Sequence, residues 1–282
     1  MLAMLNPATR QSFMWRWQRI PVIVVVAALG VALLVFLLQE HLIYFPRRYA
    51  PGVAGAPGHG LRPLRYTVDG NRGVAFWRAP RDGGRWWVVF SGNAALALEW
   101  DELLAGDAHD GFLLIDHPGY GATEGTPSPT TIDANADAAF AALAREAGVD
   151  AAALARSAGV LGHSLGAAIG LRFATRHEVD RVVLLSPFTT MHAMARRQMG
   201  WPLSELLTHR FDNEASLNTL AARLRRPVII ILHGDSDDLI PITMSRQLVK
   251  QHPWVALREL KGVGHDDIPG RVGDIRMAFG GS

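Results

Sequence analysis

The chain has no cysteine among its 282 residues, which excludes disulfide bonds, thiolate metal sites and a cysteine nucleophile. It also has little excess of either charge, since 28 lysines and arginines face 26 aspartates and glutamates, for a net charge of +2. That balance excludes a polyelectrolyte tail and argues against a nucleic-acid-binding protein, which needs a concentrated basic face. Charged residues make up only 19% of the chain and hydrophobic residues 49%, which excludes wholesale disorder.

What the sequence does have is a long apolar run near its start. Residues 20–38 contain no charged residue and would, as a helix, span roughly the 30 Å core of a bilayer. We therefore predict an uncleaved single-pass transmembrane helix at 20–38, preceded by a basic segment at 1–19. A cleaved signal peptide is the alternative, but its apolar region is usually about 7–15 residues long and small residues follow it. Here Gln39-Glu40-His41 follows instead.

The residues on either side of the run favour a membrane helix and indicate its orientation. Aromatic residues typical of membrane–water interfaces flank it, namely Trp15, Trp17, Tyr44 and Phe45. Three arginines precede the run and two follow it: Arg10, Arg16, Arg19, Arg47 and Arg48. This difference predicts that the N-terminus is cytoplasmic and that the main domain is extracytoplasmic, on the periplasmic side of a single-pass anchor.

The rest of the chain reads as alternating strands and helices. Glycine and proline are frequent in residues 46–63, so we predict a linker at 39–60 and one domain at 61–282. Eight strands are predicted at 64–68, 74–77, 86–90, 112–115, 159–161, 182–185, 228–232 and 255–260. Five helices are predicted at 94–104, 131–147, 165–175, 242–251 and 267–279. The pattern predicts an α/β fold with a mostly parallel eight-stranded sheet and helices on both faces, with an irregular segment at 187–212 that caps the site.

The strongest chemical signal is Gly162-His163-Ser164-Leu165-Gly166, which lies between a predicted strand and a predicted helix. A serine in G-x-S-x-G at such a junction occupies a tight turn and projects its hydroxyl at a helix N-terminus, where developing negative charge is favoured. A capping serine between two packing glycines is the alternative interpretation.

A serine nucleophile needs a base, and the base needs a carboxylate that orients it. His265 lies in a glycine-rich turn after the last predicted strand, and three aspartates follow the strand before it: Asp235, Asp237 and Asp238. The order Ser164, Asp237, His265 matches the order in α/β-hydrolases. His117, His163 and His233 flank the same strand ends and are interpreted as residues that shape the site.

Six motifs, in order, resemble α/β-hydrolases of the Bem46/ABHD13/ABHD17-like group, serine hydrolases that often carry an N-terminal membrane anchor. They are Leu42-Ile43-Tyr44-Phe45-Pro46, Phe90-Ser91-Gly92-Asn93-Ala94, Asp116-His117-Pro118-Gly119-Tyr120-Gly121, Gly162-His163-Ser164-Leu165-Gly166, His233-Gly234-x-x-Asp237-x-x-x-Pro241 and Gly264-His265-Asp266-Asp267. The resemblance implies the α/β-hydrolase fold. It favours Asp237 as the triad acid, because Asp237 stands four residues before Pro241, with Asp235 as the second choice.

The resemblance also implies an oxyanion hole. The family usually has His-Gly-Asn where this chain has Ser91-Gly92-Asn93. We assign one donor to the backbone N–H of Asn93, with Ala94 as the next candidate, and the second to the N–H of Leu165. Asn93 acting only to tie its loop together is the alternative.

These features predict a membrane-anchored serine hydrolase that cleaves carboxylic esters or thioesters, on small-molecule or lipid acyl substrates, through an acyl-enzyme. A catalytically silent domain that acts as a membrane-tethered interaction module, and a serine peptidase or amidase, are the alternatives. No cofactor and no metal are predicted, since Asp266 and Asp267 beside His265 read as solvated loop residues. Met191, Met194 and Met199 either line an acyl pocket or pack in the ordinary way.

Overall fold

A computed structural model describes residues 7–81, 83–106 and 109–280 of the chain, and side chains from residue 21 onward. The described side chains therefore do not include Trp15 and Trp17, which were predicted to lie at the interface. Nor do they include the three arginines that precede the apolar run, Arg10, Arg16 and Arg19.

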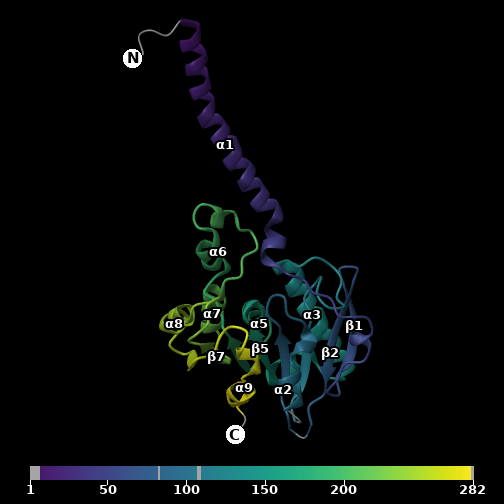
Figure 1. Cartoon of the computed structure of the whole chain (residues 1–282). Coiled ribbons are helices and arrows are strands. Elements are labelled where there is room, and N and C mark those ends of the chain that lie inside the picture. Colours follow the sequence, from purple (N-terminus) through teal and green to yellow (C-terminus); the bar gives the residue numbers. More distant parts are fainter. Residues whose placement is uncertain (1–6, 82, 107–108, 281–282) are drawn as a thin grey trace.

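A single eight-stranded sheet organises the domain, as predicted (Figure 1). Its strands are β1 (Arg62–Val68), β2 (Asn71–Arg78), β3 (Trp86–Phe90), β4 (Gly111–Ile115), β5 (Ala158–His163), β6 (Arg181–Leu185), β7 (Val228–Gly234) and β8 (Ala256–Leu260). The order across the sheet is β1-β2-β4-β3-β5-β6-β7-β8. The β1–β2 and β2–β4 pairs are antiparallel and the other five pairs are parallel.

The strand order places the site. From β3 the chain moves outward to β4 and then returns to the other side of β3 as β5. The segments that leave β3 and β5 therefore diverge, and ligands of open α/β sheets bind at such a reversal, beyond the carboxyl ends of the strands. Ser91 follows β3 and Ser164 follows β5, so two of the predicted site segments start at this point.

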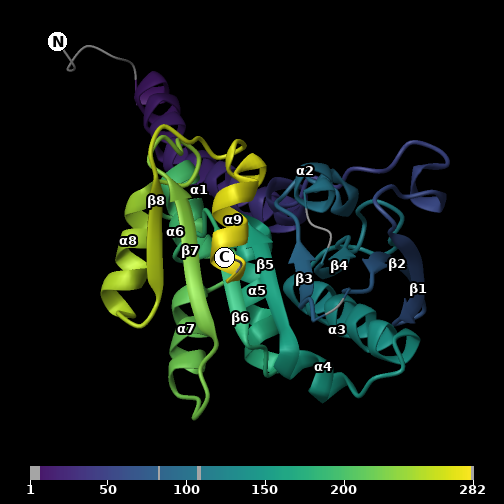
Figure 2. The same ribbon diagram turned by 90° about the horizontal axis from the view of Figure 1, so that it is seen from below.

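Helices cover both faces of the sheet, as predicted (Figure 2). One face packs against α3 (Pro129–Glu146), α4 (Ala151–Ser157), α5 (Leu165–Arg176), α7 (Asn213–Ala221) and α8 (Ile242–Gln251). The other packs against α2 (Asp101–Ala105) and α9 (Val272–Phe279). The inner strands β3, β4, β5 and β6 read as continuous apolar runs because they are buried on both sides.

The sequence prediction missed or misplaced several helices. Residues 188–211 were expected to be irregular, but they contain α6 (Met191–Met199) and the 3₁₀ turn η3 (Leu203–Leu206). The hydroxyl of Thr190 caps α6 by accepting the backbone N–H of Ala193 at 2.9 Å. Asp150 and Asp212 cap the unpredicted α4 and α7 in the same way.

Two predicted helices are shorter and interrupted. The helix expected at 94–104 is a 3₁₀ turn, η2 (Ala97–Glu99), followed by α2. The last helix begins at Val272, because Pro269 stands in a separate 3₁₀ turn, η4 (Ile268–Gly270).

The N-terminal helix α1 (Pro7–Ile43) leaves the domain as a long rod (Figure 1). We predicted that the apolar helix ends at Leu38, but the helix continues to Ile43, and residues 21–43 are long and apolar enough to cross a membrane. By length and composition, this is an apolar helix that fits either a membrane anchor or a signal sequence.

The segment after α1 packs against the domain. Tyr44, predicted to be an interfacial aromatic, is buried, with its ring 5.6 Å from that of His209. Arg47 pairs with Glu99 at 2.8 Å and its carbonyl accepts the N–H of Gly121. Only one 3₁₀ turn, η1 (Val53–Gly55), was found in residues 46–60 of the described chain.

A buried aromatic cluster joins α3 to α5, and its removal tests the core. Phe140 is 1% exposed, and its ring centroid lies 5.3 Å from that of Phe173. Phe140→Ala is expected to lower the free energy of unfolding by about 3–5 kcal/mol, because it leaves a cavity. Denaturant unfolding of the detergent-solubilised chain, followed by circular dichroism, measures the change. Leu224→Ala, at a fully exposed leucine, is the control, and an equal loss in both variants would contradict the assignment.

Candidate active site

Ser164 occupies a strained turn between β5 and α5. Its backbone has φ 55° and ψ −116°, a region that residues other than glycine seldom adopt. The flanking glycines are required by contact distance. A Cβ on Gly162 would lie 2.2 Å from the Gly166 carbonyl oxygen, and one on Gly166 would lie 2.1 Å from the Phe90 carbonyl oxygen. The chain can therefore make this turn against β3 only with glycine at both positions.

The structure brings His265 and Asp237 into contact. His265 Nδ1 lies 2.7 Å from Asp237 Oδ2, and both residues are buried. The other oxygen of Asp237 accepts the backbone N–H groups of Leu239 at 3.1 Å and Ile240 at 2.8 Å. Burial alone would raise the pKa of Asp237, but hydrogen bonds from His233, His265 and the Ile240 N–H outweigh it and hold the pKa well below its usual range. Asp237 is therefore an anion that fixes the orientation of His265.

The other two aspartates after β7 have different surroundings. Asp235 is exposed and accepts the N–H of Gly262 at 2.6 Å, so it holds the turn that precedes His265. Asp238 is exposed too. Of the three, Asp237 is the residue placed against His265, as the proline spacing suggested.

Two buried histidines support this pair. The ring of His163 lies 4.8 Å from that of His265, and its Nε2–H donates to the His265 carbonyl oxygen at 3.2 Å. Burial, and next the nearby His265, lowers the pKa of His163 to about 3, so the ring is neutral. His233 Nε2 lies 3.3 Å from Asp237 Oδ2, and its Nδ1 lies 2.7 Å from the Ser245 hydroxyl. Both histidines position the pair, and their places beside Ser164 and before Asp237 in the sequence were the signal for this role.

Hydrogen bonds to Ser91 hold the loop after β3. The Ser91 hydroxyl donates to the Leu96 carbonyl at 3.2 Å and accepts the indole N–H of Trp100 at 3.1 Å. His117 Nε2–H donates to the Ser91 carbonyl oxygen at 3.1 Å, and burial lowers the pKa of His117 to about 4. The Ser91 hydroxyl, at the position where the family usually has histidine, thus joins the start of this loop to Leu96 and Trp100, and His117 holds it through the backbone.

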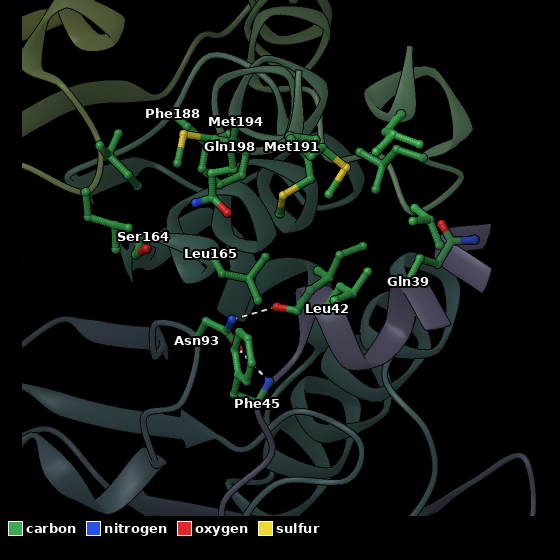
Figure 3. A pocket seen from close by; sticks show the side chains of 18 of the residues that line it. Gln39, Leu42, Phe45, Asn93, Ser164, Leu165, Phe188, Met191, Met194 and Gln198 are labelled. Atoms are coloured by element: carbon green, nitrogen blue, oxygen red, sulfur yellow. Dashed lines mark hydrogen bonds between the residues drawn. The ribbon is translucent and has the colours of Figure 1, made fainter. Parts of the chain in front are cut away.

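Asn93 ties this loop to the segment that follows α1 (Figure 3). Its side-chain Nδ2 donates to the Ile43 carbonyl at 2.6 Å, while Oδ1 accepts the Phe45 N–H at 3.1 Å and the Tyr120 hydroxyl at 2.7 Å. Oδ1 also accepts the Ala94 N–H at 3.1 Å, which engages the second candidate oxyanion donor. The side chain of Asn93 therefore has the role of holding its loop in place, which was the alternative interpretation. These bonds do not use the backbone N–H of Asn93, which remains the candidate oxyanion donor.

Two cavities meet at Ser164. The first has a volume of about 320 Å³, and its lining is largely apolar, including Leu165, Phe188 and the three methionines Met191, Met194 and Met199 (Figure 3). The second has a volume of about 410 Å³ and is more polar, with Arg47, Glu99, His163, His265 and Asp266 among its lining residues. Asn93, Ala94, Ser164 and Leu239 line both. Among the described residues, no cluster of His, Asp and Glu side chains is placed to hold a metal ion.

Comparison with known sequences identifies the family. Residues 88–206 match the family described as the alpha/beta hydrolase fold. The chain is 34% identical over 275 residues to the uncharacterized protein Rv2307c of Mycobacterium tuberculosis, across 91% of this chain and 92% of that protein. It is 30% identical over 159 residues to alpha/beta hydrolase domain-containing protein 17B of Xenopus laevis, across 54% of this chain and 49% of that protein. The chain belongs to the α/β-hydrolase family.

Solved structures agree with this fold. An α/β hydrolase from Vibrio vulnificus superposes with a TM-score of 0.62 and 16% identity, across 78% of this chain and 80% of that one. The esterase RhEst1 from a Rhodococcus species superposes with a TM-score of 0.55 and 18% identity, across 77% of this chain and 98% of that one. A bacterial membrane phospholipase A superposes with a TM-score of 0.58 and 13% identity, across 94% of this chain and 98% of that one. That last coverage of this chain requires part of residues 1–43 to be matched as well.

A matched pair of substitutions distinguishes the aspartates. Asp237→Asn is expected to slow the reaction of Ser164 with a fluorophosphonate probe by about 10⁴-fold, because the amide stabilises the wrong histidine tautomer. Asp235→Asn keeps the oxygen that accepts the Gly262 N–H and is expected to react within about two-fold of the unmodified chain. The second-order labelling rate is the measurement. A large loss in Asp235→Asn with none in Asp237→Asn would reverse the assignment.

Proposed function

We propose that the protein is a membrane-anchored serine hydrolase that cleaves carboxylic ester or thioester bonds through an acyl-enzyme formed on Ser164. The observation that carries the proposal is the buried contact of 2.7 Å between His265 Nδ1 and Asp237 Oδ2, made beside a serine on a strained turn. A structural serine would have no need of such a turn, or of glycine at the two flanking positions, where a Cβ would clash with neighbouring backbone atoms. The family supports hydrolysis in general, and the triad supports an acyl-transfer route.

The reaction proceeds in two halves. His265 Nε2 removes the proton from the Ser164 hydroxyl as its oxygen attacks the acyl carbonyl carbon, and Asp237 stabilises the resulting imidazolium. The N–H groups of Asn93 and Leu165 bind the oxyanion, and the Leu165 N–H is one of those that the start of α5 leaves without a helical partner. His265 then gives its proton to the departing alcohol or thiol. Water activated by His265 cleaves the acyl-enzyme and releases the carboxylic acid.

The substrate is a lipophilic acyl compound. The cavity of about 320 Å³ beside Ser164 is lined mostly by apolar side chains, and methionine fills irregular apolar spaces adaptably. The proteins of similar structure include an esterase and a membrane phospholipase A, which agrees with this substrate class. The catalytically silent alternative is not favoured, because Ser164, Asp237 and His265 are all retained.

The apolar helix is the anchor rather than a cleaved signal. Gln39, in the last turns of α1, accepts the backbone N–H of Thr208 at 2.9 Å, and Ile43 is bonded to Asn93. Cleavage that removed the whole of α1, which ends at Ile43, would take both contacts from the folded domain. The excess of arginine before the helix supports an extracytoplasmic, periplasmic position for the domain.

Activity-based labelling tests the function directly. The full-length chain in detergent is expected to react with a fluorophosphonate, and Ser164→Ala is expected to abolish labelling because the nucleophile is gone. Ser236→Ala, at an exposed serine near the same edge, serves as the matched control and should label normally. Equal labelling of Ser164→Ala and the unmodified chain would contradict the proposal, as would a folded wild-type chain that does not label.

A bond-type series separates the ester and thioester proposal from the amidase alternative. Matched oxygen-ester, thioester and anilide substrates with the same acyl group are compared by kcat/KM. We expect turnover of the ester and thioester to exceed that of the anilide. A preference for the anilide would favour the peptidase or amidase alternative.

A further inference from the structure

The anchor helix forms one wall of the apolar cavity. Val35, Gln39, Leu42 and Ile43 line the same cavity as Ser164, and their spacing of four, three and one residues places them on one face of α1. Figure 3 shows Leu42 and Gln39 on the α1 ribbon, across the cavity from Met191 and Met194 of α6. The cavity is therefore bounded by the hydrolase core, by the residues of the cap and by the helix proposed to cross the membrane.

A buried amide fastens α1 to the cap. Gln39 is 8% exposed, and its Oε1 accepts both the N–H and the hydroxyl of Thr208, at 2.9 and 2.8 Å. Its Nε2 donates to the Phe36 carbonyl at 2.9 Å, so the polar atoms are satisfied in apolar surroundings. The turn η3 also packs against α1. These contacts hold the wall in place and make it part of the folded domain.

The cap has the features of a segment that meets a membrane surface. Figure 1 shows that α6 and the loop beyond it extend beside α1, at the end of the domain from which α1 departs. At this tip Trp201 is 72% exposed, and Arg196 and Arg197 are also exposed. Tryptophan is enriched at membrane–water interfaces, and arginine there extends its charge to the headgroups. A bilayer that holds α1 thus brings its surface to the space between α1 and the cap.

The polar cavity on the other side of Ser164 has different chemistry. Arg47 and Glu99 form an ion pair of 2.8 Å there, and Asp266 adds a further carboxylate. A substrate whose carbonyl lies at Ser164 would therefore place one end among apolar side chains and the other among charges and water. This division matches an amphiphile with an acyl chain and a polar leaving group.

We infer that α1 and the cap together form an acyl-chain groove that opens to the bilayer surface, so that the enzyme takes amphiphilic acyl esters from the membrane that anchors it. The inference rests on the proposed function. The acyl chain lies between Leu42 of α1 and the methionines of α6, and the polar leaving group occupies the cavity beside Arg47. The anchor is thus a substrate-binding element as well as a tether.

The test narrows the groove from the α1 side. Leu42→Trp is compared with Leu37→Trp, which places the same bulk on the same helix at a residue that does not line the cavity and is 63% exposed. Full-length variants in phosphatidylcholine nanodiscs hydrolyse p-nitrophenyl hexadecanoate and p-nitrophenyl butanoate. Leu42→Trp is expected to lower the ratio of long-chain to short-chain kcat/KM by about ten-fold or more, and Leu37→Trp to leave that ratio unchanged. An unchanged ratio in Leu42→Trp, with active enzyme, would overturn the groove while leaving the proposed function intact.

A binding measurement separates the groove from catalysis. In the Ser164→Ala background, a hexadecanoic acid that carries a diazirine is photo-crosslinked to the protein in detergent, and the labelled residues are mapped by mass spectrometry. Crosslinks to α1 and α6 that Leu42→Trp reduces, and Leu37→Trp does not, would support the groove even if the wild-type chain hydrolysed no ester. Crosslinks confined to other surfaces would overturn it.

Discussion

The close approach of the Ser164 turn to the end of β3 is the constraint on which the site depends. Gly166 lies so near the Phe90 and Ser91 carbonyl oxygens that no side chain fits between them. This contact sets the separation between Ser164 and the Ser91-Gly92-Asn93 loop, and with it the position of the N–H groups proposed to bind the oxyanion. The sheet provides the space for the site, because the segments that leave β3 and β5 diverge toward opposite sides at this edge.

The position of the same loop also depends on the residues that end and follow α1. The side chain of Asn93 holds Ile43 and Phe45, and Tyr120 closes the cluster from the loop after β4. The segment between α1 and the first strand is therefore part of the site's architecture. These hydrogen bonds are partly buried, and together they favour one arrangement of the loop and of the segment after α1. The N-terminal helix and the hydrolase domain are thus joined structurally at this point.

Much of this organisation was predictable from the sequence, for identifiable reasons. The strands β3 to β7 are mainly apolar runs, and β1 and β2 form a hairpin, so most strand positions and the fold followed from periodicity. The edge strand β8 has a weaker signal, because it contains Arg258 and Glu259. The residues at Ser164, Asp237 and His265 were found because each follows a strand in a short motif, and the structure places Asp237 against His265. Their catalytic roles remain part of the proposal.

The misses also have physical causes. Residues 188–211 looked irregular because the short helix α6 carries polar residues between its methionines, and its apolar face became apparent only against α1. The extent of α1 was underestimated because Gln39 and Glu40 look like the end of an apolar run, whereas Gln39 is buried by a partner 169 residues away. A contact between residues so far apart in the sequence produces no local pattern of residue types from which it could be predicted.

The tie between Ile43 and Asn93 has a consequence for how the protein is made. Synthesis runs from the N-terminus, so α1 emerges before any strand of the sheet, and Asn93 follows Ile43 by 50 residues. Thr208, which meets Gln39, emerges much later still. The last turns of α1 are thus made while one face is still uncovered, and the hydrolase domain completes its folding against a helix that has already been synthesised.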